Sequence, residues 1–480
     1  MRNRFNAVTQ EDVTSFRHIV GEGNVIFGDP DRLAPYRSDE SGEHHAGDPE
    51  VVVKPQTTRE VSRVATHCSQ RSIPITARGA GSGLAGGAVP LFGGVVLSFE
   101  KMSRILEIDT ENMVAVVEPG VVTDDLCRRV AEDGLFYGGY PMSVESSYIG
   151  GNVACNAGGA KVIKYGSTAA HVLGLEVVLA SGEVLHLGGK RRKDSSGYSL
   201  LRLMVGSEGT LGLITKVFLR LIPQPGPTVD LLVPFASTEA AVAAFPQAIM
   251  AAIGMPSAVE LMDNLTMRYC MEYTGHDVPM IDESDAYLIL QIEANDKDSL
   301  LDAYRPVGEA CMNAGALEVF VADNPWTSEK IWSIRRNCLE ALKVVDLTVE
   351  GGDFVVPSTE IPAMMAFIRA LSATHGIEIP CAGHVADGNI HPHPLKPDDR
   401  SLEEWITQRH ELLSEIALKA VELGGAVSGE HGIGFLKKDI LAQSKRDELR
   451  AMKAIKDALD PEGILNPGKL FPGEAKEEAD

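Results

Sequence analysis

Residues 74–87 read Pro74-Ile75-Thr76-Ala77-Arg78-Gly79-Ala80-Gly81-Ser82-Gly83-Leu84-Ala85-Gly86-Gly87, an apolar run that passes into a loop with five glycines. Without side chains in the way, the backbone N–H groups of such a loop can converge on one point and bind an anion. A tight turn between two strands explains one or two glycines, but not a stretch in which Leu84 alone is large. We therefore predict a phosphate-binding loop.

The loop also matches GxGxxG, from Gly81 to Gly86, a pattern that in Rossmann folds binds NAD. That interpretation needs a helix directly after the loop, because the helix N-terminus holds the pyrophosphate. Pro90 and Gly93-Gly94 follow instead, and then the strand-like run 95–99. The sequence therefore argues against a Rossmann site.

Composition excludes several classes of protein. The chain has 480 residues, 44% of them hydrophobic, and a formal net charge of −23, which disfavours nucleic acid and anionic membrane surfaces as partners. Seven scattered cysteines without a CxxC motif indicate reduced thiols, a cytoplasmic setting and no iron–sulfur cluster. Residues 1–16 lack the apolar stretch of a signal peptide, and no apolar run approaches the roughly 20 residues of a membrane-spanning helix.

Three prolines within residues 223–227 predict an extended linker between two α+β regions. Before it we expect strands at 51–53, 73–77, 94–99, 105–108, 113–117, 174–179, 183–187 and 213–221, and helices at 9–20, 58–69 and 122–133. After it we expect strands at 286–293 and 317–321, and helices at 238–253, 297–314, 328–344, 359–375, 411–423 and 446–459. This predicts a first domain over 1–225, a second over 226–425 and a C-terminal segment over 426–480.

Two more glycine clusters follow the first, at 149–159 and 206–212. With residues 74–83 they resemble the flavin-binding segments of the vanillyl-alcohol-oxidase (PCMH-type) flavoproteins, in the branch of the glycolate oxidase flavin subunit, D-lactate dehydrogenase and D-2-hydroxyglutarate dehydrogenase. The similarity runs from about Tyr36 to Phe471 and includes 460–469, which in this family returns the C-terminus to the flavin domain. It implies an α+β fold: a PCMH-type FAD-binding domain and a second α+β cap, the FAD-linked oxidase C-terminal domain.

The resemblance also implies which residues hold FAD. The first cluster would cradle the pyrophosphate, the second would line the isoalloxazine and ribityl path, and the third would approach the adenine. The implied residues are Arg78, Gly79, Ala80, Gly81, Ser82, Gly83, Gly87, Pro141, Ser147, Gly150, Gly151, Asn156, Gly158, Gly159, Glu208, Gly209, Ile214 and Asn466. The chain departs from the family at 139–141, where Gly-Tyr-Pro replaces Pro-Asp-Pro, and at Tyr148, often a threonine. No histidine or cysteine of the first loop suits a covalent flavin link, so we expect non-covalent FAD.

Histidine and glutamate concentrate in two segments of the second region, Gly383-His384-Val385-Ala386-Asp387-Gly388-Asn389-Ile390-His391-Pro392-His393 and Ser428-Gly429-Glu430-His431. Gly388 and Pro392 disfavour a helix, so His384 and His391 are expected on a loop or at strand ends. Two imidazoles and one carboxylate with open positions suit zinc, and also Fe(II) or Mn(II). A single histidine is more often an ordinary hydrogen-bonded residue, but this density among glycines favours a site.

In the family that the chain resembles, the positions of His384, His391 and Glu430 bind a divalent metal, and that of His431 is the general base. A metal (zinc, or else manganese or iron) would polarise the substrate's 2-hydroxyl, and a neutral imidazole would accept its proton. The segment that ends at Arg335 resembles the one whose arginine binds the substrate carboxylate. The alternative is a surface salt bridge from Arg335 to Glu340 or Asp346, with Arg336 as the surface member of the pair.

The chain departs from the D-2-hydroxyglutarate enzymes at Gly351, where they have a lysine, and at His393, where they have an asparagine. The second carboxylate of a dicarboxylate would lack its partner. We therefore predict an FAD-dependent dehydrogenase that oxidises a small D-2-hydroxy acid, glycolate or D-lactate, to the 2-oxo acid, with hydride transfer to flavin N5.

No redox motif follows the flavin segments, so electrons must leave through a separate acceptor: a quinone, a cytochrome, a transfer flavoprotein or an iron–sulfur subunit. Direct reduction of oxygen is the alternative. Rival hypotheses are a same-fold oxidase or dehydrogenase of another alcohol or of D-2-hydroxyglutarate, and a non-catalytic flavin-binding subunit of a larger complex. The expected location is the cytoplasm, peripheral to a membrane through a partner at most, and the sequence leaves the oligomeric state open, a homodimer included.

Overall fold

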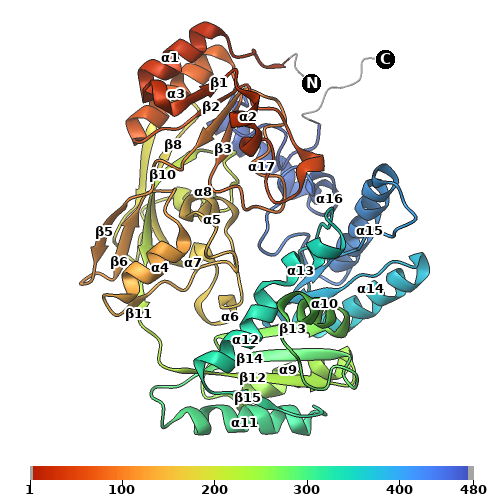
Figure 1. Cartoon of the computed structure of the whole chain (residues 1–480). Coiled ribbons are helices and arrows are strands. Elements are labelled where there is room, and N and C mark those ends of the chain that lie inside the picture. Colours follow the sequence, from red (N-terminus) through yellow and green to blue (C-terminus); the bar gives the residue numbers. More distant parts are fainter. Residues whose placement is uncertain (1–3, 474–480) are drawn as a thin grey trace. The chain divides into compact units, whose positions relative to one another are not determined.

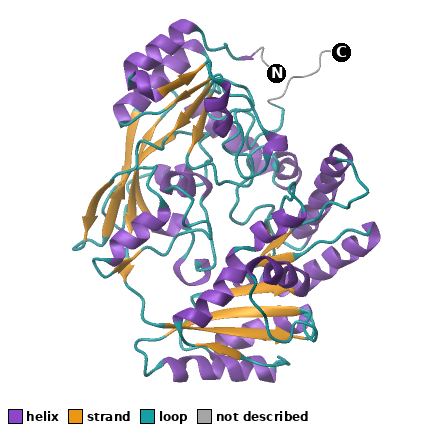
Figure 2. Ribbon diagram, viewed as in Figure 1, coloured by secondary structure: helices purple, strands orange, loops and turns teal. Residues whose placement is uncertain are grey.

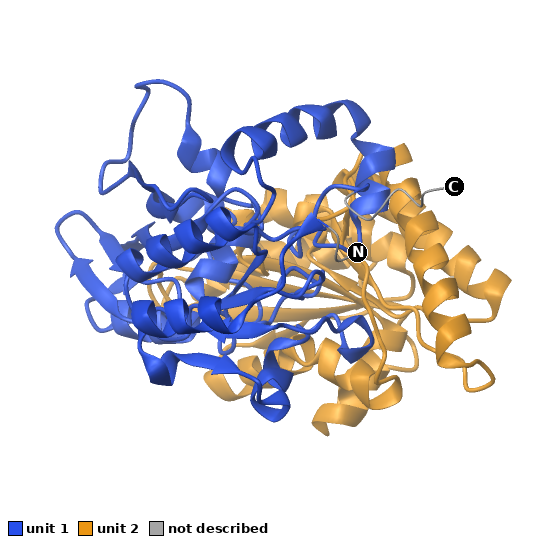
Figure 3. Cartoon of the chain, turned by 90° about the horizontal axis from the view of Figure 1, so that it is seen from above, with its two compact units in different colours: residues 1–158, 166–224, 430–480 blue, residues 159–165, 225–429 orange. Residues whose placement is uncertain are grey.

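The computed structural model describes residues 4–473 and divides the chain into two compact units, which Figure 3 shows in different colours. Unit 1 is formed by Met1–Gly158, Gly166–Gln224 and Glu430–Asp480, and unit 2 by Gly159–Tyr165 and Pro225–Gly429. The chain passes from unit 1 to unit 2 inside the proline run at 223–227. It returns at Glu430, so the C-terminal segment belongs to the unit that begins the chain.

Unit 1 is built on two main sheets (Figures 1 and 2). The first has the order β1-β2-β4-β3, in which β2 and β3 pair in parallel with β4, and the second has the antiparallel order β5-β6-β10-β8-β9. The strands are β1 (Val25–Phe27), β2 (Val51–Val53), β3 (Ile75–Arg78), β4 (Val95–Ser98), β5 (Ile105–Asp109), β6 (Val114–Val117), β8 (Val172–Val178), β9 (Val184–Gly188) and β10 (Leu213–Arg220), with a small pair of β7 (Leu135–Phe136) and β11 (Ile222–Pro223).

The helices of unit 1 bury the sheets' apolar side chains. They are α1 (Gln10–Val20), α2 (Pro30–Leu33), α3 (Thr58–Arg71), α4 (Thr123–Ala131), α5 (Ile149–Cys155), α7 (Thr168–His171), α8 (Leu200–Met204), α16 (Lys438–Ser444) and α17 (Arg446–Leu459). Helix α1 begins with a capping box, because Thr9 and Asp12 satisfy each other's backbone N–H groups. Phe16 of α1 and Val64 of α3 pack with Val51 and Val95 in one fully buried core.

The structure confirms the absence of a helix after the first glycine loop, since residues 79–94 contain no helix or strand and lead directly into β4. The second glycine cluster, for which no helix was predicted, contains α5. Asn156 ends this helix in the left-handed conformation, with φ 51° and ψ 48°. A helix of seven residues inside a glycine-rich segment leaves little periodicity for the sequence to show.

Unit 2 contains a seven-stranded sheet of order β15-β12-β14-β13-β17-β18-β16, antiparallel throughout. Its strands are β12 (Thr228–Phe235), β13 (Ala258–Asp263), β14 (Ala286–Glu293), β15 (Phe320–Ala322), β16 (Phe354–Val355), β17 (Cys381–Gly383) and β18 (Asn389–Pro392). Its helices are α6 (Val162–Tyr165), α9 (Thr238–Ala251), α10 (Asn264–Thr274), α11 (Leu300–Asn313), α12 (Pro325–Arg336), α13 (Cys338–Val345), α14 (Ile361–His375) and α15 (Leu402–Glu422). Burial along β12 and β14 is almost unbroken, so both faces of the sheet are covered.

Three expectations for unit 2 need correction. The helix expected at 328–344 is two helices that break at Asn337, whose side-chain amide donates to the Ser333 carbonyl and competes with the helical backbone. The helix expected at 411–423 begins at Leu402, after a capping box formed by Ser401 and Glu404. The strand expected at 317–321 begins only at Phe320.

Two features bear on the inferences from composition. All seven cysteines are free thiols, as the absence of close pairs predicted. Within residues 4–473, no helix combines the length and the apolar character needed to cross a membrane.

Candidate active site

The first glycine loop is held from behind by Arg78, the last residue of β3. Its guanidinium donates to the backbone carbonyls of Ser38 (2.6 Å) and Pro35 (3.0 Å), and only 8% of the residue is exposed. Gly81 has φ +80°, and a Cβ there would lie 2.2 Å from the guanidinium. Arg78 therefore supports the turn of the loop, and only glycine fits at position 81.

The structure brings the three glycine clusters together in unit 1. A Cβ on Gly79 of the first cluster would lie 3.7 Å from the Cα of Gly151 in the second. A Cβ on Gly209 of the third would lie 3.4 Å from the Cβ of Ala77 and 3.9 Å from the Asn466 side chain. The Asn466 amide donates to the carbonyls of Gly87 (3.0 Å) and Glu208 (2.8 Å). The predicted cofactor residues thus converge from segments far apart in sequence.

The converging glycines fit a large phosphate-bearing ligand. A Cβ added to Gly87 or to Gly151 would meet no atom of the described residues within 4 Å. Bare backbone with open space beside it is what a dinucleotide needs for close approach, and a loop without side chains can present its N–H groups to a diphosphate. The residues present therefore suit FAD.

Other predicted cofactor residues form hydrogen bonds and packing contacts within the protein itself. The Ser147 hydroxyl lies 3.0 Å from that of Thr123, and the Asn156 side chain accepts the N–H of Ala169 at 2.9 Å. Ile214 lies in β10 and belongs to a buried apolar cluster. Gly150 packs against Pro119, Pro141 lies in a segment without regular structure, and Gly158 and Gly159 fall at the boundary between the two units.

Glu208 holds the segment that follows His431. Its carboxylate accepts the backbone N–H of Ile433 (2.8 Å) and of Gly434 (2.7 Å), and burial raises its pKa. The nearest carboxylate oxygen of Glu430 lies 3.8 Å from Nε2 of His431. Glu208 therefore fixes the backbone two residues beyond the predicted base, a role that the sequence did not reveal.

In unit 2, one buried carboxylate connects a predicted metal ligand with the arginine predicted to bind the substrate carboxylate. Glu260 of β13 is fully buried. One of its oxygens lies 2.7 Å from Nδ1 of His384, and the other accepts from the Arg335 guanidinium at 2.7 Å. Arg335 and His384 are themselves 6% and 3% exposed. The charge of Glu260 is thus balanced by Arg335 inside the protein, and its second oxygen orients an imidazole.

His391 lies beside His384, with ring centroids 5.4 Å apart and planes at 84°. His384 directly follows β17 and His391 lies in the short strand β18, as expected from Gly388 and Pro392. Nδ1 of His391 lies 3.3 Å from the Gly352 carbonyl and 3.9 Å from the carboxylate of the buried Asp353. Each imidazole is therefore oriented through Nδ1 by an oxygen of unit 2.

Asp353 also fixes the chain that leads to Glu430. Its second carboxylate oxygen accepts from the Ser428 hydroxyl (2.6 Å) and the Gly429 N–H (3.0 Å). Gly429 is the last residue of unit 2, and Glu430 follows it in the chain. Asn389, two residues before His391 on the same strand, buries a side-chain oxygen that has no hydrogen-bond partner among the described residues. An unsatisfied buried oxygen is a reason to expect a ligand there.

The alternative considered for Arg335 is wrong, because its carboxylate partner is Glu260 rather than Glu340 or Asp346. Arg336 is the exposed member of the pair, as expected, and bonds Glu329. The sequence analysis missed Glu260 and the positioning role of Asp353. A glutamate inside the apolar run 258–262 was the available signal, since such a residue is rarely buried without a partner.

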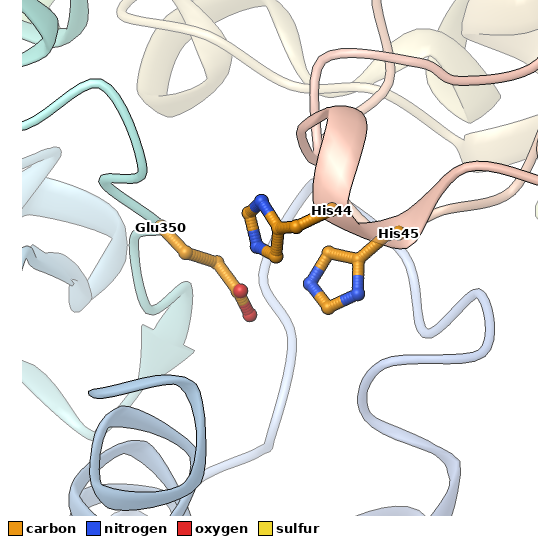
Figure 4. A group of neighbouring side chains, drawn as sticks. All are labelled: His44, His45 and Glu350. Atoms are coloured by element: carbon orange, nitrogen blue, oxygen red, sulfur yellow. The ribbon is translucent and has the colours of Figure 1, made fainter. Parts of the chain in front are cut away.

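A further pair of imidazoles lies in unit 1 on the short 3-10 turn Glu43–His45 (Figure 4). The rings of His44 and His45 have centroids 4.1 Å apart and planes tilted by 44°. Glu350, also labelled in Figure 4, belongs to unit 2, where it accepts from the buried Arg409 at 2.6 Å. The sequence analysis did not single out these residues, and we assign no ligand to them.

Comparison with known proteins identifies the class that this fold and site define. Residues 49–188 match the family model of an FAD binding domain, and residues 224–470 match that of the FAD linked oxidases, C-terminal domain. The chain therefore belongs to the FAD-linked oxidoreductases with these two domains.

The relatives narrow the class further. The chain is 37% identical over 472 residues to D-lactate dehydrogenase of Anaerostipes hadrus, covering 97% of this chain and 98% of that protein. It is 40% identical over 430 residues to glycolate oxidase subunit GlcD of Bacillus subtilis, covering 89% and 90%. Among solved structures, 4-ethylphenol oxidase from Gulosibacter chungangensis superposes with a TM-score of 0.78 at 20% identity, covering 98% of this chain and 99% of that one. The last likeness shows the fold.

Proposed function

We propose that this protein is an FAD-dependent dehydrogenase of a small D-2-hydroxy acid, with glycolate or D-lactate as substrate and a divalent metal bound by His384, His391 and Glu430. The observation that carries the proposal is the orientation of the two imidazoles. Both are buried, both are oriented through Nδ1, and they lie side by side in a protein whose relatives oxidise 2-hydroxy acids by name.

The chemistry of the donor set supports the metal. When Nδ1 of an imidazole is held by a carboxylate or a carbonyl, Nε2 becomes the ligand nitrogen, and metal-binding histidines commonly have such a partner. The partner at Nδ1 is the carboxylate of Glu260 for His384 and the backbone carbonyl of Gly352 for His391. Asp353 holds the backbone of Gly429, which directs the approach of Glu430. Two neutral imidazoles and one carboxylate suit zinc, with Mn(II) and Fe(II) as alternatives.

When bound, FAD supplies a hydride acceptor and the metal a Lewis acid that lowers the pKa of the substrate's 2-hydroxyl. The protein must then remove the hydroxyl proton and hold the anion. We assign the proton to the imidazole of His431, which has 17% of its side chain exposed and whose backbone is restrained by the bonds of Glu208 just beyond it. Arg335 would hold the substrate carboxylate while keeping its bond to Glu260.

The packing of unit 2 supports a monocarboxylate. A Cβ on Gly351 would lie 2.5 Å from Nε2 of His393, whose ring fills the space beside that glycine. His393 is 9% exposed, so its ring is part of the core there. The position at which the D-2-hydroxyglutarate enzymes carry a lysine therefore has no room for a long side chain unless His393 moves. This favours glycolate and D-lactate over a dicarboxylate.

Electrons would pass to a separate acceptor. One relative is by name a subunit of glycolate oxidase, which supports a partner redox protein. A quinone, a cytochrome, a transfer flavoprotein and an iron–sulfur subunit each satisfy the chemistry, and the cytoplasm remains the proposed location.

An anaerobic reduction assay tests the function. The flavin absorbance of the purified holoprotein should bleach with glycolate or D-lactate and not with the L-enantiomer of lactate. Treatment with a chelator followed by gel filtration should abolish bleaching, and zinc or manganese should restore it. As a control, the variant Lys396→Gln, at a half-buried lysine of unit 2 outside the proposed site, should bleach and respond to the chelator as the wild-type protein does. If no 2-hydroxy acid bleaches a protein that is fully loaded with FAD, the proposal is overturned in favour of a binding subunit.

A further inference from the structure

Three buried cations of the described chain form an ion pair with a carboxylate. Arg335 pairs with Glu260, Arg409 with Glu350, and Lys456 with Asp460. Such pairing is expected, because an unpaired charge in the protein interior costs on the order of several kcal/mol. The charge of each of these three cations is therefore already balanced inside the protein.

Lys469 is an exception. It is 1% exposed, and its ammonium donates to the carbonyl oxygens of Val89 (2.6 Å) and of the Asn466 side chain (3.3 Å). The ring of Phe435 has its centroid 6.0 Å away. Within residues 4–473, no carboxylate lies within ion-pair distance of this ammonium. A buried charge is thus satisfied by neutral oxygens alone.

The position of Lys469 beside the first glycine loop indicates which negative charge could pair with its ammonium. Val89 comes two residues after Gly87, the end of the first glycine loop, and Asn466 donates to the Gly87 carbonyl. At the other end of the loop Arg78 is likewise buried, and its guanidinium donates to the backbone carbonyls of Ser38 and Pro35. Two cations without a carboxylate partner among the described residues therefore flank the loop, although the chain as a whole carries a net charge of −23.

We propose that Lys469 is a counter-charge for the diphosphate of FAD, fixed behind the loop by Val89 and Asn466. The proposal rests on the FAD binding of this family and is independent of the substrate. FAD carries about two negative charges on its diphosphate, and in a poorly solvated site the attraction of a nearby ammonium is stronger than in water. Lys469 acts in this view as a positioning and electrostatic residue rather than as a catalytic one.

The charges around Lys469 agree with this role. Burial lowers its pKa to about 7, the carboxylates of Asp39 and Glu208 act in the opposite direction, and Lys438 adds to the lowering. Glu208 already bonds two backbone N–H groups, and Asp39 bonds Ser41 and Ala88. A bound diphosphate would raise the pKa of Lys469, so FAD binding would take up a proton above pH 7. By linkage, FAD affinity should be highest below pH 7 and fall as the pH rises.

FAD release from the holoprotein tests the proposal, because free FAD regains its fluorescence. Wild-type protein should bind FAD at least tenfold more weakly at pH 9 than at pH 6. The variants Lys469→Met and Lys469→Gln should bind at least tenfold more weakly than wild type at pH 6 and lose most of the pH dependence. Lys438→Gln, at a half-buried lysine of the same neighbourhood, should keep the pH dependence.

The Gln variant separates charge from structure. Its amide can still donate to the Val89 carbonyl, so a merely structural tie predicts that Lys469→Gln binds FAD like wild type. That result would overturn the proposal, and so would a variant that keeps the wild-type pH profile. If the variants do not fold, a wild-type affinity that is constant between pH 6 and pH 9 overturns it equally. A pH effect that arises elsewhere in the protein would remain in the Lys469 variants, so the comparison with wild type removes it.

Discussion

Replacing Glu260 with glutamine should damage unit 2 in two measurable ways. Glu260 is fully buried and is bonded both to Arg335 and to His384, so Glu260→Gln leaves the guanidinium without its counter-charge. Removing one partner of a buried ion pair costs about 3–5 kcal/mol. For a unit of this size about 2–4 °C is lost per kcal/mol, so the melting temperature of its transition should fall by about 6–20 °C.

The same change should weaken metal binding. The amide oxygen of glutamine can still accept from Nδ1 of His384, but it lacks the carboxylate charge that makes the imidazole a stronger ligand. Loss of such a partner typically lowers metal affinity about 10–100-fold, and we expect the lower end of that range. Thermal unfolding followed by calorimetry gives the stability, and competition with a chromophoric chelator gives the metal affinity.

A double variant separates the two effects. Glu260→Gln with Arg335→Met leaves no unpaired buried charge, so most of the lost stability should return while metal affinity stays low. Glu340→Gln, which removes an exposed carboxylate bonded to Lys343 on α13, should change neither property appreciably. The reasoning is refuted if Glu260→Gln melts like wild type, or if the double variant is no more stable than the single one.

Three other substitutions test separate parts of the structure. His431→Ala should retain FAD but stop flavin reduction by a 2-hydroxy acid, and unchanged stopped-flow kinetics would remove His431 from the mechanism. Gly151→Ala should stabilise helix α5 of the flavin-free protein by about 0.5–1 kcal/mol and yet weaken FAD binding, because a Cβ there meets only open space beside the glycine loop; tighter FAD retention would contradict this. Burial raises the pKa of Asp263 from 3.8 to about 6, so its contribution to stability is present below pH 4 and lost as the pH rises to 6. Asp263→Asn should lack this loss, and urea midpoints that keep the same difference from wild type at pH 4 and pH 7 would disprove it.

Local patterns in the sequence were sufficient for much of the fold. Strands 51–53 and 286–293 and helix 446–459 have the predicted bounds, because apolar runs, caps and prolines mark them locally. The glycine loop was predicted to be a phosphate site for the same reason, and the lack of a following helix distinguished it from a Rossmann loop. Other elements were missed: β13 passes directly into α10, with Asp263 as both the last residue of the strand and the N-cap of the helix, and α5 is hidden by its glycines.

The candidate site was predictable only in part. His384 and His391 stood out because they are dense and lie among glycines. Their partners did not, since Glu260 is 124 residues from His384, and the bonds of Glu208 span 225 residues to Ile433. No local pattern encodes which strand neighbours which in an antiparallel sheet, so the role of a buried glutamate becomes visible only when β13 and β17 are seen to pair.

Charge balance connects these observations to function. A chain with a net charge of −23 must meet an anionic ligand with local positive charge, and the described structure shows where that charge is already neutralised. The positive charge of Arg335 is balanced by Glu260. By itself, Arg335 would therefore orient a substrate carboxylate through hydrogen bonds but would add little net electrostatic attraction. Under the proposed function, the attraction in unit 2 would then come chiefly from the metal that the two imidazoles would hold. In unit 1 Arg78 and Lys469 have no such carboxylate among the described residues, and the glycine loop between them is where a diphosphate would find its counter-charge.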